Sequence, residues 1–412
     1  MLLDYLYKYL PLCIFLGIWG IVFFLYNLQL YNIYPASSET ILLILYGILA
    51  FTLGYLLLAI YDIKDISLPQ RSLDDIIDPK GLFLIVLMLS FITFLGASLI
   101  FIAVSKELGG YDVYFRIPIA VRNQIVAYQL DPLNPPPVLF ILGNYLINIG
   151  FAGTLFGGVL FALKSRLRFW GIMIVISFFV ASLVTVGRYT LFNSLFFFVL
   201  AYVLSAYFLS KERRRKKLIE IVIYTGLFVV LLSLFTVFLM EIRTTISTQN
   251  AIKEFALKTS YLYVTGGVTA LDNFLSQDFS FVYGQSSFRS LFKWLVRFDL
   301  WPESNLMYVH EPFTNVTPSI RMNTYTFIKS FYEDFGITGV LLLSFSFGAA
   351  CKLANYYFLR SFSFIRMSIL LTLSFTAMMT FYSFYLHSVT TALFRVLMVA
   401  LVQYIFLKKI YK

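Results

Sequence analysis

The chain has 412 residues, of which 60% are hydrophobic and only 13% are charged. A soluble domain of this length cannot bury so many apolar side chains, whereas a bilayer gives each apolar helix of about 20 residues an apolar solvent. The apolar runs are long and continuous, which excludes a membrane barrel of short alternating strands. The net charge of +11 comes mostly from short basic loops and therefore predicts no nucleic-acid partner.

Ten apolar runs predict an all-α polytopic membrane protein with about ten transmembrane helices. The helices are expected at residues 11–30, 40–61, 81–104, 138–163, 169–187, 189–210, 218–240, 336–358, 367–386 and 388–407. Three parts follow: seven helices with an outer loop at 105–137, then a large extracytoplasmic loop with an interfacial helix, then three helices. These parts span residues 1–240, 241–335 and 336–412.

The orientation follows from the basic residues in short loops, because such residues stay on the cytoplasmic side of a membrane. In a ten-helix arrangement they all fall on one side: KSRLR at 164, KERRRKK at 211, Arg360, Arg366 and KKIYK at 408. We therefore expect both termini in the cytoplasm and the two long loops on the opposite side of the membrane.

The apolar run from Phe169 to Ser210 is about twice as long as one membrane crossing, so it predicts a tight helical hairpin. Gly187 and Arg188 form the turn, which places Arg188 at the outer membrane interface. Two interpretations follow: the guanidinium reaches out to lipid phosphates, or it is held in place for an anionic ligand.

The predicted helices contain few ionisable residues, namely Glu220, Lys352 and Arg395. Proton-driven carriers and ion channels usually carry carboxylates or histidines through their helices, and many carriers show duplicated halves. Neither feature is present in this sequence. A carrier is therefore disfavoured, and the polar chemistry is expected in the outer loops.

The segment NTYTFIKSFYEDFG at 323–336 predicts an amphipathic helix at the membrane interface, which Gly336 releases into the eighth transmembrane helix. Its apolar positions recur at helical spacing: Tyr325, Ile328, Tyr332 and Phe335. Glu333 and Asp334 fall at its end, where carboxylates oppose the helix dipole. These two acids are either solvated or compensated by an arginine or a substrate hydroxyl.

The segment YLYVTGG at 261–267 combines Tyr261 and Tyr263 with Gly266 and Gly267. The glycines let the backbone approach a ligand or simply permit a turn. His310 titrates near neutrality and is either a base or an incidental loop residue. No histidine or carboxylate pair has metal-ligand spacing, so we expect no bound metal and no cofactor.

The glycine-arginine turn at Gly187 and Arg188, the segment YLYVTGGVTAL and the segment NTYTFIKSFYEDFGITG resemble the Wzy-type polymerases of O-antigen and capsule repeat units. The resemblance implies a GT-C-like membrane fold in the bacterial inner membrane, with the active site on the periplasmic side. It implies a metal-independent glycosyltransferase whose donor and acceptor glycans are both linked to undecaprenyl pyrophosphate. Membrane lipids and a chain-length regulator are the further partners that it implies.

The resemblance also implies roles for residues of the outer segments. Arg188, Arg243 and Arg321 would stabilise the pyrophosphate leaving group. The base would be Glu241, His310 or Asp334, with Asp334 ranked first because it lies in the matching motif, although an aspartate there also has a structural interpretation. The substrate-binding set comprises Arg116, Arg122, Tyr261, Tyr263, Gly266, Gly267, Tyr325 and Glu333.

Two rival functions remain at this point. An O-antigen ligase has a similar plan but transfers the glycan to a lipid A core. A flippase moves lipid-linked sugars without forming bonds, and it is expected to line a cavity across the bilayer with charges, which this sequence places outside its helices.

Overall fold

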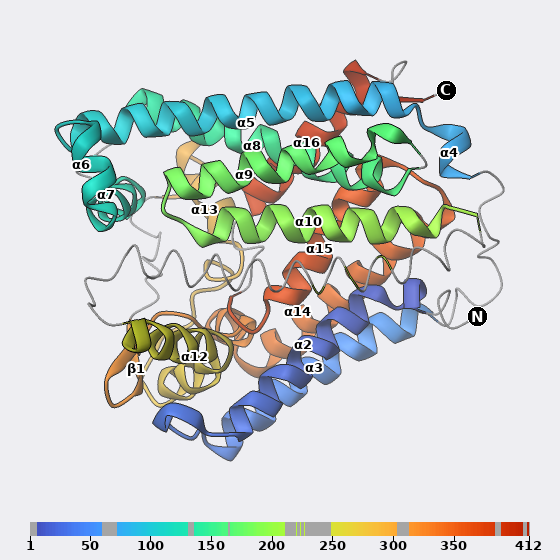
Figure 1. The fold of residues 1–412 in the computed structure, drawn as a ribbon. Helices are drawn as coiled ribbons and strands as arrows, with labels where there is room; N and C mark the ends of the chain where they lie inside the picture. The colour runs from blue at the N-terminus through green and yellow to red at the C-terminus, as the bar shows by residue number, and fades with distance from the viewer. Residues whose placement is uncertain are drawn as a thin grey trace. The chain divides into compact units, whose positions relative to one another are not determined.

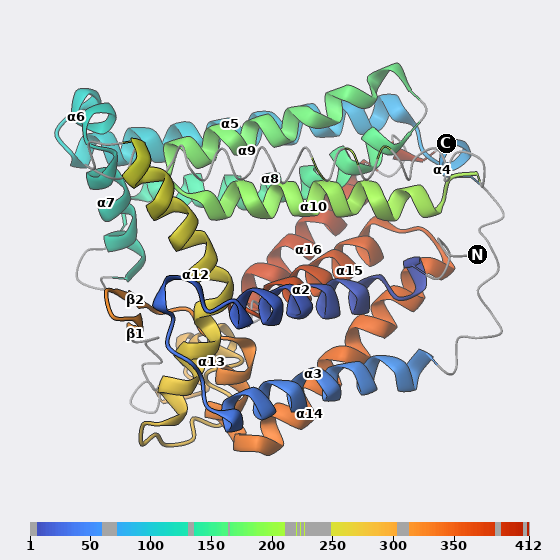
Figure 2. The same ribbon diagram turned by 60° about the horizontal axis from the view of Figure 1, so that its bottom comes forward.

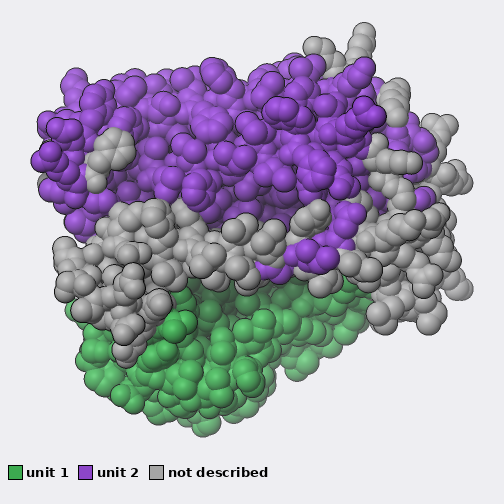
Figure 3. Space-filling model, viewed as in Figure 1, with its two compact units in different colours: residues 1–68, 257–394 green, residues 69–256, 395–412 purple. Residues whose placement is uncertain are grey.

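The computed structural model describes residues 6–59, 72–130, 136–163, 165–210, 220, 223, 226, 249–302, 313–383, 389–406 and 410–411. Helices dominate these residues (Figure 1). The chain divides into two compact units (Figure 3). Unit 1 comprises residues 1–68 and 257–394, and unit 2 comprises residues 69–256 and 395–412.

Unit 1 contains helices from both ends of the chain. Its elements are α2 (Leu10–Asn27), η1 (Leu30–Asn32), α3 (Ser38–Ala59), most of α12 (Gln249–Leu275), α13 (Arg289–Arg297), β1 (Thr314–Thr317), β2 (Ile320–Met322), α14 (Phe327–Arg360) and α15 (Phe364–Met379). Helix α12 runs along the ends of α2 and α3 (Figure 2). The first residues of α16 (Val389–Ile405) also belong to this unit.

Unit 2 is a bundle of long apolar helices. Its elements are α4 (Leu73–Ile76), α5 (Pro79–Glu107), α6 (Tyr111–Arg116), α7 (Pro118–Leu130), α8 (Val138–Ala162), η3 (Arg166–Ile172), α9 (Met173–Val184), α10 (Arg188–Tyr207) and the rest of α16. Helix α5 packs against α8 through Gly96 and Gly143, where a Cβ on either residue would lie 2.7 Å from the other's carbonyl oxygen. Glycines therefore allow these two helix backbones to touch.

Seven helices of the described residues are long and apolar enough to cross a membrane, so the chain is a polytopic helical membrane protein. They match the first six predicted helices and the eighth, and the shorter α15 and α16 match the last two. The prediction at 218–240 falls almost entirely outside the described residues. The antiparallel hairpin of β1 and β2, which pairs Asn315 with Arg321, departs from the expected all-α chain.

The tight hairpin predicted between residues 169 and 210 is confirmed. Helix α9 ends at Val184 and α10 begins at Arg188, so only three residues connect them. The turn requires a positive φ of 47° at Val186, and Gly187 is the N-cap of α10. Arg188 is therefore the first residue of a helix rather than part of the turn.

The core of unit 1 depends on a close crossing of α3 and α14. A Cβ at Gly54 would lie 2.0 Å from the carbonyl oxygen of Phe345, and a Cβ at Gly348 would lie 2.0 Å from that of Phe51. Backbone atoms occupy these spaces and have no alternative rotamer to adopt. The two glycines thus let the backbones of two membrane-spanning helices come into direct contact.

Two buried polar side chains, those of Tyr55 and Asn355, form hydrogen bonds with the backbone at the start of α2. Pro11 has no N–H, so the carbonyl of Tyr7 lacks its usual helical donor. The amide of Asn355 donates to the carbonyls of Tyr7 and Lys8, at 3.0 and 2.8 Å, and the hydroxyl of Tyr55 also donates to that of Lys8. These bonds join α2, α3 and α14 where the helix begins irregularly.

Candidate functional site

The polar side chains of unit 1 gather in a region that we call the cap, defined as α12, the β1–β2 hairpin, α13 and residues 327–335 of α14. The end of α2, the start of α3 and the end of α15 all meet this region. The backbone N–H of Phe327, for example, donates to the carbonyl of Thr380 at 2.8 Å. These three helix ends therefore meet at the cap.

Tyr261 anchors α12 to the connection between α2 and α3. Its hydroxyl donates to the carbonyl of Leu25 and accepts from the N–H of Leu30, both at 3.0 Å. Burial raises the pKa of this hydroxyl, which keeps its proton available for donation. Tyr261, which was predicted to bind substrate, thus connects two segments of unit 1.

Asp272 is a second anchor, which the sequence interpretation missed. Its Oδ1 accepts from the N–H and the hydroxyl of Ser37, at 2.9 and 2.6 Å, and from the hydroxyl of Thr40 at 2.7 Å. Partial burial raises the pKa of this carboxyl, but the hydrogen bonds from Ser37 and Thr40 outweigh that effect and hold it below its ordinary value. The ionised carboxylate therefore caps the N-terminus of α3, where the helix dipole favours it.

Gly266 and Gly267 serve packing within the cap. A Cβ at Gly267 would lie 2.7 Å from the carbonyl oxygen of Phe381, and one at Gly266 would lie 2.9 Å from the Sδ of Met322. The pair thus brings α12 against the end of α15 and against the hairpin. The backbone of α12 does approach another group closely, as predicted, but that group is part of the protein itself.

The helix expected before Gly336 is present from Phe327, but most of its residues are buried within the protein. Residues 324–331 are all buried, and the ring of Phe327 contacts the rings of Phe15 and Trp19. Gly336 ends this segment as predicted, with a φ of 62° that interrupts α14. These residues can be buried because Lys329 finds its partner inside the cap.

Lys329 is the buried cation of this segment, and it too was missed. Its ammonium lies 2.7 Å from Oε2 of Glu333, and the exposed fractions of the two side chains are 2% and 14%. The same ammonium lies 5.1 and 5.5 Å from the ring centres of Phe274 and Tyr325. The spacing of lysine and glutamate by four residues is the sequence signal that pairs them. Glu333 and Tyr325, both predicted to bind substrate, therefore share one cluster.

Asp334 accepts hydrogen bonds from two successive backbone N–H groups, those of Ser286 at 2.9 Å and Ser287 at 2.8 Å. Its exposed fraction is 0%. The carboxylate therefore secures the turn that precedes α13 to the end of the buried helix. This geometry supports the structural interpretation of Asp334, since a base must reach its substrate.

Replacing Asp334 with alanine is expected to lower the free energy of unfolding by about 2–4 kcal/mol, because two buried N–H groups lose their acceptor. Asparagine keeps one acceptor oxygen and should cost less. Chemical unfolding in detergent micelles measures both effects. Asp278→Ala, which removes an exposed carboxylate from the same region, is the control and should change stability by less than about 0.5 kcal/mol. Equal stability of Asp334→Ala and the control would refute the role of the carboxylate.

The predicted arginines are distributed over both units. Arg188 begins α10 in unit 2, and its N-cap residue supplies no side-chain hydrogen bond to the first turn. The hydroxyl of Tyr114 donates to the carbonyl of Val184, which joins α6 to the end of α9. Arg116, the last residue of α6, therefore lies at the same end of unit 2 as Arg188.

The remaining predicted residues have the following places. Arg122 lies on α7 of unit 2. Arg321 is exposed on β2 of unit 1, where its Nη2 donates to the carbonyl of Phe313 at 2.8 Å. The ring of Tyr263 lies 5.9 Å from that of Tyr382. Glu241, Arg243 and His310 lie outside the described residues.

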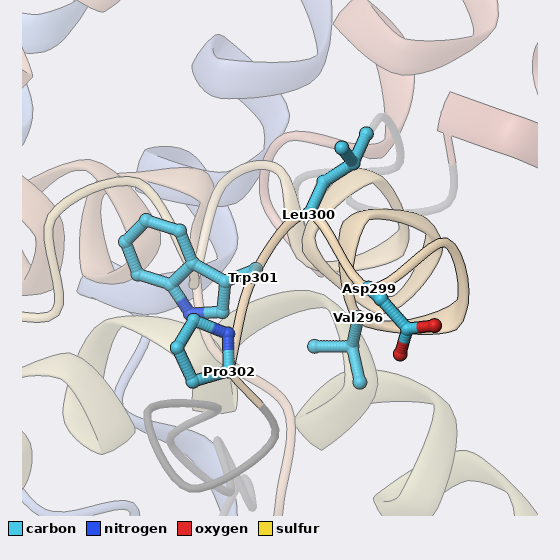
Figure 4. Close-up of a pocket in the computed structure, with 5 residues that line it drawn as sticks. All are labelled: Val296, Asp299, Leu300, Trp301 and Pro302. Atoms are coloured by element: carbon cyan, nitrogen blue, oxygen red, sulfur yellow. The ribbon is translucent and has the colours of Figure 1, made fainter.

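A cavity of about 270 Å³ lies at the end of α13 and is lined by Val296, Asp299, Leu300, Trp301 and Pro302 (Figure 4). The indole of Trp301 meets the ring of Phe292 edge to face, at 5.3 Å between centres. The carboxylate of Asp299 points away from that indole (Figure 4). The part of the chain that the structure describes contains no group of three or more metal-ligating side chains.

Comparison of the chain with family models, with curated proteins and with solved structures gives no match.

Proposed function

We propose that the protein is a glycosyltransferase that polymerises lipid-linked oligosaccharide repeat units, as the resemblance to Wzy-type polymerases implies. The observation that carries this proposal is where the carboxylates lie. In the described membrane-spanning helices, aspartate and glutamate occur only in terminal turns and in the cap segment of α14. A site at the membrane surface fits this distribution better than a path through the bilayer, which disfavours the flippase.

The leaving group of the proposed reaction is a lipid pyrophosphate. The first N–H groups of α10 point toward its N-terminus, and the residue there is Arg188, with Arg116 at the same end of the unit. Helix N-termini and guanidinium groups both favour phosphate, so this end of unit 2 suits the pyrophosphate. Arg243 and Arg321 keep their predicted role in stabilising the leaving group.

In the transfer itself, an acceptor hydroxyl oxygen bonds to the anomeric carbon of the donor glycan while the bond from that carbon to the pyrophosphate oxygen breaks. The electron pair of the broken bond remains on the pyrophosphate, and the hydroxyl proton passes to a base. Glu241 and His310 remain the predicted bases. We assign Glu333 to binding an acceptor hydroxyl, because Lys329 holds Oε2 and fixes the orientation of Oε1.

Orientation and location belong to the same proposal. The protein would lie in a bacterial inner membrane with both termini in the cytoplasm and with the cap on the periplasmic side. Its donor and acceptor would both be glycans on undecaprenyl pyrophosphate, and a chain-length regulator would be a further partner.

The test is polymerisation by the purified protein in liposomes that contain a lipid-linked repeat unit, without nucleotide sugar or added metal. We expect a ladder of longer lipid-linked glycans. Transfer only to an added lipid A core would identify a ligase. Movement of the lipid-linked unit across the bilayer without any longer product would identify a flippase.

A further inference from the structure

Helix α13 carries three cations on one flank. Arg289, Lys293 and Arg297 recur every four residues and therefore follow one side of the helix. None of the carboxylates that the structure describes forms an ion pair with them. Desolvation by burial and the neighbouring positive charge of Arg289 lower the pKa of Lys293. Such a row is stabilised by an anionic partner.

A neighbouring flank of the same helix is apolar and exposed. Leu291 and Trp294 lie on α13, and Phe298 follows directly; their exposed fractions are 45%, 53% and 62%. Residues at this spacing share one side of a helix. Large exposed side chains continue just outside the helix at Tyr283 and Leu300, each with an exposed fraction of 71%. In water, this surface would be an unfavourable apolar patch.

Contacts of α13 with the rest of unit 1 fix the level at which the helix lies. The hydroxyl of Ser290 accepts from the backbone N–H of Thr390 at 3.3 Å, and Thr390 is in the first turn of the apolar helix α16. A Cβ at Gly284, in the turn before α13, would lie 3.7 Å from the ring of Phe335, directly before the membrane-spanning part of α14. Helix α13 therefore lies where two apolar helices of the unit begin, which is the level of a membrane surface.

We propose that α13 lies in the plane of the membrane surface, with its apolar flank among the upper acyl chains and with Arg289, Lys293 and Arg297 bound to the phosphates of anionic phospholipids. An amphipathic helix with aromatic residues beside a cationic flank has the composition that this position requires. The proposal rests on the membrane location of the protein and does not depend on its enzymatic function.

The test measures the depth of spin labels on the full chain in lipid nanodiscs. Cys13 and Cys351 are first replaced by alanine, and single cysteines are then introduced as Leu291→Cys, Phe298→Cys and Asp278→Cys. Power-saturation measurements compare the access of oxygen, which concentrates in the acyl region, with that of a water-soluble nickel complex. We expect labels at 291 and 298 to favour oxygen, and the label at the exposed position 278 to favour nickel.

The second arm tests the cations by comparing nanodiscs of phosphatidylcholine with nanodiscs that also contain phosphatidylglycerol. The anionic lipid should increase the oxygen preference at 298. In the triple variant Arg289→Gln, Lys293→Gln, Arg297→Gln, this increase should disappear, with the population of the immersed state falling about fivefold per cation removed. Arg360→Gln, which removes a cation from the far end of α14, is the control and should leave the increase in oxygen preference at 298 unchanged.

Each other result contradicts part or all of the proposal. Labels at 291 and 298 that behave like the one at 278 would show that α13 lies in water. Labels shielded from both oxygen and nickel would show that protein covers the helix. Immersion that is the same in both lipid mixtures would exclude the binding of anionic headgroups.

Discussion

Replacing Arg188 with alanine is expected to abolish long glycan chains while leaving the single lipid-linked unit intact. A cation that stabilises the departing pyrophosphate acts mainly in the transition state, so its loss should lower turnover by about 100- to 1,000-fold. Arg243→Ala and Arg321→Ala should act in the same direction. The measurement is the distribution of chain lengths, both in cells and with the purified lipid-linked substrate.

The matched control is Arg360→Ala, because this exposed arginine lies at the end of α14 away from the cap. It should leave the chain-length ladder unchanged. Protein amounts in the membrane must be equal among the variants. Normal ladders from all three variants at equal amounts would rule out the proposed stabilisation of the leaving group. A lysine at 188 adds information, since partial activity would indicate that charge matters more than bidentate geometry.

Replacing Gly348 with alanine is expected to destabilise the protein by about 3 kcal/mol or more. The new methyl group would lie 2.0 Å from the carbonyl oxygen of Phe51, so α3 and α14 must separate. Gly54→Ala creates the reciprocal collision and should behave alike. The loss is measured as a lower midpoint of chemical or thermal unfolding in detergent.

Gly17→Ala and Gly20→Ala are the controls for this prediction. Both glycines lie in an apolar helix, and a Cβ at either would meet no atom within 4 Å. We expect no loss of stability and a gain of at most about 1 kcal/mol, because only helix propensity and lipid contact are altered. An unfolding midpoint of Gly348→Ala equal to those of the controls would mean that the two helices do not cross at this point.

The sequence was sufficient to predict features that depend on local pattern. The hairpin around Gly187 follows from span length alone, and the interruption of α14 follows from a glycine after an amphipathic run. Both are set by the thickness of a bilayer and by the backbone freedom of glycine. The composition likewise identified the class of fold.

The sequence was not sufficient to predict which polar groups meet across the chain. Asp272 finds its partners at Ser37 and Thr40, more than 200 positions away, and no spacing rule links them. Lys329 was not singled out, because its pairing with Glu333 permits burial that the pattern of single residues does not reveal. Tyr261 was predicted to bind substrate, whereas the hydrogen bonds that it makes depend on a break after α2 that only the fold shows.

Gly336 interrupts α14 and divides it into two rods, a shorter one at residues 327–335 and a longer one at residues 337–360. The longer rod is fixed in the membrane by its crossing with α3, while the shorter rod is held by Asp334, Lys329 and the contacts around Phe327. Since Phe335 and Gly336 between them have non-helical backbone angles, a change in the tilt of one does not force an equal change in the other. The longer rod can therefore change its tilt when the bilayer thickness changes, while the polar groups of the shorter rod keep their positions.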